Sequence, residues 1–209
     1  MGVFDDDDEV AIVGYRNRMR AAGRARAAAR AQANQAFRDA VAPARQALVA
    51  ALAAATSGPQ RRAAKIAYGD AILPAKVARK AALQSARIDY VEAAEQARID
   101  FLTIRGAHPE VVASARYRQA VNLATAEYRA AVTDAQATFR IQSAPIRITT
   151  RTAGSSASAG QVSHGAAESI RIATADITGV FRSQVSSARA TYQAKISVAR
   201  KILGTSLAT

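Results

Sequence analysis

The chain contains no cysteine and no tryptophan, and aromatic residues make up only 5% of its 209 positions. The lack of cysteine excludes disulfides and thiolate metal sites. Half of the sequence is hydrophobic, but much of this half is alanine, which adds little buried area at about 25 cal/mol/Å². A compact core of large side chains is therefore not expected. Long, closely packed helices or an oligomer would bury these alanines better.

Long hydrophobic runs are also missing. The longest, Ala47–Ala55, is far shorter than the ~20 residues that a membrane-spanning helix needs. Met1 is followed by an acidic run, Asp5–Glu9, and not by the basic and then apolar segment of a secretory signal. These features predict a soluble, cytoplasmic protein.

Acidic residues are scarce relative to basic ones. The chain has 29 Lys and Arg against 16 Asp and Glu, which gives a net charge of +13, and five of the basic residues are lysines. Such a surface attracts polyanions, chiefly nucleic acid, or an anionic membrane. Arginine forms forked contacts with phosphate, although GC-rich coding also enriches arginine and alanine. Both explanations are open at this point.

Recognisable catalytic motifs are absent. The sequence has no phosphate-binding glycine loop, dinucleotide fingerprint, zinc-ligand spacing or nucleophile elbow. Asp89, Glu92 and Glu95 fall at steps of three on a predicted helix, which could bring acid–base groups together. An exposed face with local partners such as Arg98 explains them better. We therefore predict a protein that is not an enzyme, with no catalytic residue, metal or cofactor.

The sequence does contain a helical repeat of eleven residues. Tyr117, Tyr128 and Phe139 are spaced by eleven, and an aliphatic residue and an alanine follow each tyrosine at steps of four and three. Such steps keep residues on one face of an α-helix, and eleven residues in three turns is slightly looser than the helix's own 3.6 residues per turn. The repeat predicts helix pairs that are nearly straight or gently right-handed.

The same register recurs in three further segments, which run over residues 15–55, 68–101 and 170–203. We therefore predict an all-α fold: an elongated, oligomeric bundle of long helices with eleven-residue (hendecad) periodicity. The residues expected to form helix-packing or oligomer contacts are Tyr68, Ile88, Tyr90, Ile99, Phe101, Tyr117, Val121, Tyr128, Val132, Phe139, Phe181, Val185, Tyr192 and Ile196.

The segment over residues 68–101 has a second apolar stripe. Ile66, Val77, Ile88 and Ile99 are also spaced by eleven, roughly on the face opposite the aromatic residues. A helix that is apolar on two faces is either central in a bundle or shared between subunits. The chain has few helices to surround it, so we predict that neighbouring subunits share this helix.

Proline, glycine and serine divide the chain into segments. Ile146–Thr149 alternates like a short strand, and residues 154–160 form a Gly/Ser-rich tract. The predicted organisation is an acidic segment at 1–9, a long-helix region at 10–144 with breaks near 43, 56–59 and 106–109, an extended or flexible linker at 145–165, a helix at 166–204 and a tail at 205–209.

The most basic stretch is the first helix. Two of its arginines, Arg26 and Arg30, interrupt the apolar stripe, and an unpaired buried guanidinium is very costly. We expect this part of the helix to face water, acidic residues or phosphate. The candidate nucleic-acid contacts are Arg16, Arg18, Arg20, Arg24, Arg26 and Arg30.

An arginine follows each aromatic residue of the clearest repeat, as in Tyr117-Arg118 and Tyr128-Arg129. Such pairs could stack nucleic-acid bases, as in single-strand binders. The aromatic residues share the register of Val121 and Val132, however, so core packing with arginines at its edge is the favoured interpretation.

Residues 105–139 resemble internal core, or ejection, proteins of short-tailed bacteriophages. The resemblance lies in a glycine-containing break before a helix with Arg-Tyr-Arg-Gln-Ala at 116–120 and Ala-Glu-Tyr-Arg-Ala at 126–130. It implies a homo-oligomer inside the capsid, ringed above the portal beside packaged DNA. Its other partners would be portal or core proteins, and a late membrane contact would follow expulsion.

Two other functions are compatible with the sequence. The charge permits a DNA-organising coiled-coil protein, and alanine-rich amphipathic helices also occur in phasin-like coats on lipid or polymer surfaces. A surface coat needs one broad, exposed apolar face, whereas a narrow repeat suits contact between helices.

Overall fold

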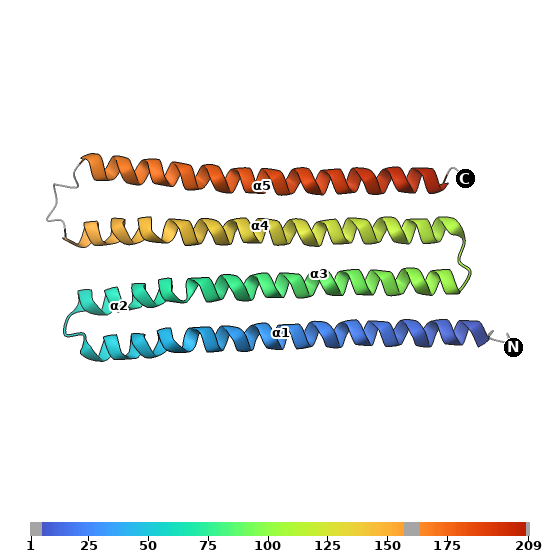
Figure 1. Ribbon diagram of the computed structural model, residues 1–209, viewed down its shortest axis with the longest axis horizontal. Coiled ribbons are helices and arrows are strands. Elements are labelled where there is room, and N and C mark those ends of the chain that lie inside the picture. The colour runs from blue at the N-terminus through green and yellow to red at the C-terminus, as the bar shows by residue number, and fades with distance from the viewer. Residues whose placement is uncertain (1–5, 157–163, 208–209) are drawn as a thin grey trace. The chain divides into compact units, whose positions relative to one another are not determined.

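The computed structural model describes residues 6–156 and 164–207, and these are almost entirely α-helical (Figure 1). The helices are α1 (Asp6–Ala54), α2 (Gly58–Ala71), α3 (Leu73–Ile104), α4 (Pro109–Ser156) and α5 (His164–Leu207). The described residues form no strand. The all-α prediction is confirmed.

Helix α1 continues through Pro43, where the sequence predicted a break. An internal proline removes one hydrogen bond and costs about 3 kcal/mol. Packing offsets this cost on both sides, because Val41 is buried and Ala44 and Leu48 are half-buried. The predicted break is absent because the sequence interpretation considered the local effect of proline and not the packing of its neighbours.

Local signals define the three connections within residues 55–108. Ser57 caps α2 by accepting a hydrogen bond from the Gln60 amide, and the Gln60 side chain accepts one from the Ser57 amide. The helix is then interrupted at Ile72, between α2 and α3 and two residues before Pro74. Gly106 ends the turn after α3 with a φ of 61°. The Ala107 amide donates to the Leu102 carbonyl there, as in a Schellman motif.

The extended linker predicted for residues 145–165 is wrong over its first part. Helix α4 includes Pro145 and ends at Ser156, so the strand-like Ile146–Thr149 is helical. An isolated strand leaves backbone groups without partners, whereas a helix satisfies them internally. The rest of the linker at 157–163, residues 1–5 of the acidic segment and residues 208–209 of the tail lie outside the described residues.

The chain divides into two compact units. Unit 1 comprises Met1–Ala33, Ala82–Ala130 and Ala188–Thr209, and unit 2 comprises Asn34–Ala81 and Ala131–Ser187. In unit 1 the helix segments contact one another in the series α1–α3–α4–α5. The connecting pairs are Tyr15–Phe101 between α1 and α3, Glu95–Asn122 and Gln96–Gln119 between α3 and α4, and Tyr128–Tyr192 between α4 and α5.

The α1–α3 seam of unit 1 advances by eleven residues from one contact to the next. The Tyr15 and Phe101 ring centroids lie 5.3 Å apart. Eleven residues further along α1 and eleven back along α3, the Arg26 guanidinium lies 4.9 Å from the Tyr90 ring centroid. A cation thus occupies an aromatic position of the register and packs on the facing ring.

Unit 2 contains the corresponding contacts. Arg79 lies 5.2 Å from the Phe37 ring centroid on α1 and donates to Asn34, and the Phe139 and Phe181 rings lie 5.5 Å apart between α4 and α5. Elsewhere in unit 2, Arg171 donates to exposed Glu168, and this hydrogen bond lowers the pKa of that carboxyl below its usual value.

The core consists mainly of alanine. No large side chain in the described residues is fully buried. The buried residues of unit 1 are Ala11, Ala22, Ala33, Ala86, Ala97, Ile99, Ala115, Ala124, Ala126 and Ala199, and those of unit 2 are Val41, Ile72, Ala135 and Ala137. Small side chains in these seams let helix backbones approach closely.

The fourteen residues expected to form packing contacts are all at least half-buried. Ile99 is buried, and the other thirteen are half-buried: Tyr68, Ile88, Tyr90, Phe101, Tyr117, Val121, Tyr128, Val132, Phe139, Phe181, Val185, Tyr192 and Ile196.

The two apolar faces of α3 differ in what they meet within unit 1. Tyr90 and Phe101 face α1, whereas Glu95, one turn before buried Ile99, contacts α4. Ile99 also lines a surface groove of unit 1, so the sharing of this helix between neighbouring subunits stays a prediction. The sequence did not show that α1 and α4 lie on opposite sides of α3.

Candidate nucleic-acid interface

Two of the six α1 arginines proposed as nucleic-acid contacts are engaged within unit 1. Arg18 forms an ion pair with Asp100 of α3, and Arg26 stacks on Tyr90. Both guanidiniums therefore already have a partner on α3. For Arg26 this partner is an aromatic ring, which the sequence expectation of water, an acidic residue or phosphate did not include, because the negative face of a ring also attracts a guanidinium.

The other four α1 arginines are exposed and form no ion pair with residues that the structure describes: Arg16, Arg20, Arg24 and Arg30. Arg16, Arg20 and Arg24 follow at steps of four and therefore form one stripe along the helix. This stripe lies away from Tyr15, whose ring contacts α3.

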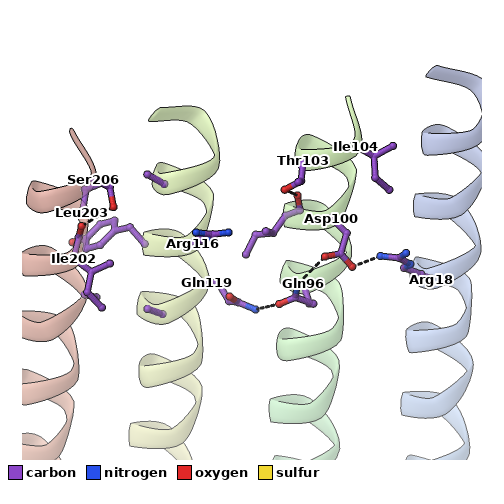
Figure 2. A pocket seen from close by; sticks show the side chains of 15 residues that line it. Arg18, Gln96, Asp100, Thr103, Ile104, Arg116, Gln119, Ile202, Leu203 and Ser206 are labelled. Atoms are coloured by element: carbon purple, nitrogen blue, oxygen red, sulfur yellow. Dashed lines mark hydrogen bonds and ion pairs between the residues drawn. The ribbon is translucent and has the colours of Figure 1, made fainter. Parts of the chain in front are cut away.

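A groove of about 800 Å³ hollows one side of unit 1 (Figure 2). It is lined by residues from α1, α3, α4 and α5, so these four helix segments each present one side to the same space. Arg18 and Asp100 lie at its α1 edge, and Gln119 donates to Gln96 across the α3–α4 seam at 3.2 Å. We call this side of unit 1 the groove face.

Helix α4 places arginines on the side opposite the groove. Arg116 and Ala120 line the groove. Arg118 and Arg129 lie about half a turn around the helix from them, because each residue advances a helix by about 100°. They are therefore on the far side of the helix from the groove.

The other three helices of unit 1 repeat this placement. Arg87 and Arg98 lie about half a turn from groove-lining Asp100 on α3. On α5, Arg189 and Arg200 lie on the other side of the packing seam from groove-lining Ile202. On α1, Arg16 and Arg30 lie on the other side of the packing seam from groove-lining Arg18.

These eight exposed residues form what we call the arginine face: Arg16, Arg30, Arg87, Arg98, Arg118, Arg129, Arg189 and Arg200. On α3, α4 and α5 the two arginines are eleven residues apart, which is about 16.5 Å along a helix at 1.5 Å per residue. None forms an ion pair or a side-chain hydrogen bond with the described part of the chain.

Four acidic residues of unit 1 lie on the groove face, whereas Glu95 lies three residues before Arg98 and accepts a hydrogen bond from Asn122, one turn from Arg118. Asp100 and Glu127 line the grooves, where they pair with Arg18 and Lys195, and Asp89 lies three turns from Asp100 on the same side of α3. Glu92, one turn before groove-lining Gln96, shares that side. The arginine face thus carries eight cations with Glu95 beside them, and this excess of positive charge can concentrate phosphate groups.

Six of these eight arginines were not among the candidate contacts predicted on the first helix: Arg87, Arg98, Arg118, Arg129, Arg189 and Arg200. For Arg118 and Arg129, the sequence had predicted positions at the edge of the packing stripe, where they reach water or phosphate. Their eleven-residue spacing was the available signal, because it puts the members of each pair on one face of a helix. Which faces of different helices lie on the same side of unit 1 depends on the packing of those helices.

The aromatic residues of α4 are not available as a stacking ladder. Tyr117, Tyr128 and Phe139 are half-buried, and Tyr128 packs on Tyr192 and Phe139 on Phe181, each with ring centroids 5.5 Å apart. These two rings are engaged with α5, whereas Tyr117 lines the groove, so the three rings do not form one exposed ladder.

The carboxylates considered for acid–base chemistry do not form a site. Asn122 donates to Glu95 at 2.6 Å, in place of the expected partner Arg98, whereas Asp89 and Glu92 are exposed. The described residues include no group of three or more histidines or acids that could hold a metal ion. Within the same residues, no helix has both the length and the hydrophobicity needed to cross a membrane.

Comparison with known proteins identifies no relative: no protein-family model, curated protein or solved structure matches this chain.

Proposed function

We propose that this chain is a non-enzymatic structural protein that lies beside duplex DNA as an internal core or ejection component of a virion. The observation that carries the DNA contact is the arginine face, where eight exposed guanidiniums form no ion pair with any described residue. Guanidinium groups form bidentate contacts with phosphate, and such contacts carry affinity without reading sequence.

Duplex DNA suits this face better than a single strand. Single-strand binders combine a basic groove with exposed aromatic platforms, whereas the rings of Tyr128 and Phe139 pack on rings of α5. The arginine face instead presents cations over four helix segments, a broad surface suited to a rigid, regularly charged partner. Binding would therefore be non-specific and strongly dependent on salt.

The assembly part of the proposal is a homo-oligomeric ring or tube of long hendecad helices near the portal. In unit 1 the Tyr15–Phe101 and Arg26–Tyr90 contacts are one eleven-residue step apart, a spacing compatible with nearly straight helix pairs. The virion location, the portal or core partners and the late membrane contact rest on the resemblance of residues 105–139 to ejection proteins.

A DNA-organising protein is the second candidate, because the arginine face would serve it equally well. The two candidates differ in what holds the assembly together. A virion ring should keep its native mass after nuclease treatment and should copurify with particles, whereas a DNA-organising protein should disperse when its DNA is removed.

The test of DNA binding is a salt titration with a 30-base-pair duplex. We expect the affinity to fall linearly on a log–log plot, with a slope of about 0.9 per phosphate contact. Replacing Arg87, Arg98, Arg118 and Arg129 together by glutamine should reduce that slope by about 3.6, because four contacts are lost.

The matched control removes four positive charges outside the face. Arg61, Arg62, Lys65 and Lys80 are exposed residues of unit 2, and their replacement by glutamine changes the net charge equally. The control should leave the slope nearly unchanged. Equal loss in both variants would mean that net charge, and not the arginine face, determines binding.

A further inference from the structure

The groove face of unit 1 has an apolar floor between polar edges. The main groove includes Ile99, Ala120 and Leu203, and a second groove of about 360 Å³ continues along the α4–α5 seam. The two grooves share Ala120, Ala199 and Ile202. They therefore form one depression that follows these helices.

Apolar side chains that the fold leaves uncovered border this depression. Val198 and Ile202 are 58% and 56% exposed on adjacent turns of α5, and Ile104 is 52% exposed at the end of α3. All three line the grooves. Covering them would remove apolar area from water, at about 25 cal/mol for each Å².

The groove face carries unpaired charges of both signs. Arg116 lines the groove without an ion pair to any described residue, and the same holds for exposed Asp89 and Glu92 on this side of α3. With the paired Arg18, Asp100, Glu127 and Lys195, the face has three cations and four anions. Its net charge of −1 contrasts with the eight guanidiniums of the arginine face.

We propose that the groove face binds the groove face of a second copy of this chain. A two-fold interface brings the same surface from each copy together, so it must be self-complementary. The groove face meets this requirement because it carries exposed apolar residues and unpaired charges of both signs. The arginine face does not, because two copies of it would repel. This assignment rests on the oligomeric assembly put forward under the proposed function.

The available area is sufficient for such an interface. Residues 82–104 of α3 span about 34 Å at 1.5 Å per residue. Four helix segments at the usual spacing of about 10 Å extend about 30 Å across. The face is thus about 1,000 Å², whereas a stable interface needs about 800 Å² from each partner.

The pairing has a functional consequence. With the groove faces joined, the two arginine faces point outward on opposite sides of the pair. One pair can then hold two duplexes side by side, so the paired protein bridges DNA whereas a single copy only coats it.

The test uses charge variants that do not require a known register. Changing Asp89 and Glu92 to lysine gives the groove face a net charge of +3, and changing Arg116 to glutamate gives it −3. Each variant alone should have a dissociation constant for self-association at least about tenfold higher than that of the unchanged chain. An equimolar mixture should restore pairing, because the surfaces are then oppositely charged. Native mass spectrometry and sedimentation measure both effects.

An apolar pair of variants provides a second test. Ile202→Asp should abolish pairing, whereas Val111→Asp should not, because Val111 is exposed on the other side of α4. Circular dichroism checks that both remain helical. Ile202→Asp should still bind a single labelled duplex but should no longer bring two differently labelled duplexes together.

The outcomes separate the two proposals. An unchanged chain that is monomeric at micromolar concentration overturns the oligomer and this interface together. Oligomers that survive all these substitutions overturn only the groove-face assignment. Pairing without DNA binding leaves the interface in place and overturns the DNA contact. A monomer whose binding to phosphatidylcholine vesicles is lost in Ile202→Asp would assign the groove face to lipid and overturn the pairing.

Discussion

Replacing Arg26 by glutamine should destabilise unit 1 while changing DNA binding much less than the same replacement of Arg30. The two arginines are one turn apart on α1 and carry the same charge. The Arg26 guanidinium lies 4.9 Å from the Tyr90 ring centroid and is half-buried, whereas Arg30 is exposed. A cation–π contact that is partly shielded from water contributes about 0.5–2 kcal/mol.

A double-mutant cycle isolates this contact. Arg26→Gln, Tyr90→Leu and the combined variant are unfolded in urea, and the coupling energy is taken from the extrapolated free energies of unfolding. We expect a coupling of about 0.5–1 kcal/mol because the site is at a seam edge. Arg26→Gln should lower the melting temperature by about 2–4 °C for each kcal/mol lost.

Arg30→Gln is the matched control. It should leave the free energy of unfolding within about 0.5 kcal/mol of the unchanged chain, because Arg30 has no partner to lose. It should reduce the salt slope of DNA binding by about 0.9, which corresponds to one phosphate contact. A coupling energy of zero, or a slope change in Arg26→Gln as large as in Arg30→Gln, would refute the assignment of Arg26 to the α1–α3 seam.

Two further predictions concern the helix ends and the alanine seams. Gly106→Ala should destabilise the chain by about 1–2 kcal/mol, because φ is 61° there, whereas Gly69→Ala inside α2 should stabilise it by about 0.5–1 kcal/mol. Thermal unfolding distinguishes these, and equal effects would contradict the backbone argument. Ala124→Leu should cost about 1–3 kcal/mol because Ala124 is 2% exposed in unit 1, whereas exposed Ala131→Leu on the same helix should have little effect. Tolerance of leucine at both positions in urea unfolding would show that the alanine does not set the helix spacing.

Some sequence predictions failed because they rested on one local signal and did not include the tertiary packing around it. Pro43 predicted a break, but buried Val41 and half-buried Leu48 keep the helix packed across it. Ile146–Thr149 alternates like a strand and is helical, because no partner strand exists among the described residues. Propensity is a weak prior that packing overrides.

The amino-acid sequence by itself determined the long helices and the face that each one buries. Helical periodicity is local, so the spacing of Tyr117, Tyr128 and Phe139 is sufficient to place their rings on one side of α4. The turn at Gly106 and the cap at Ser57 are likewise short-range features.

Only the tertiary structure decided which charges are free. Arg16 and Arg18 are two residues apart on one basic helix, yet Arg18 pairs with Asp100, which is 82 positions away, and Arg16 remains exposed. The arginine face likewise combines residues of four helices, because packing determines which helix sides lie together. Periodicity specifies the faces of a single helix, whereas the order in which helices pack specifies the surface of the protein.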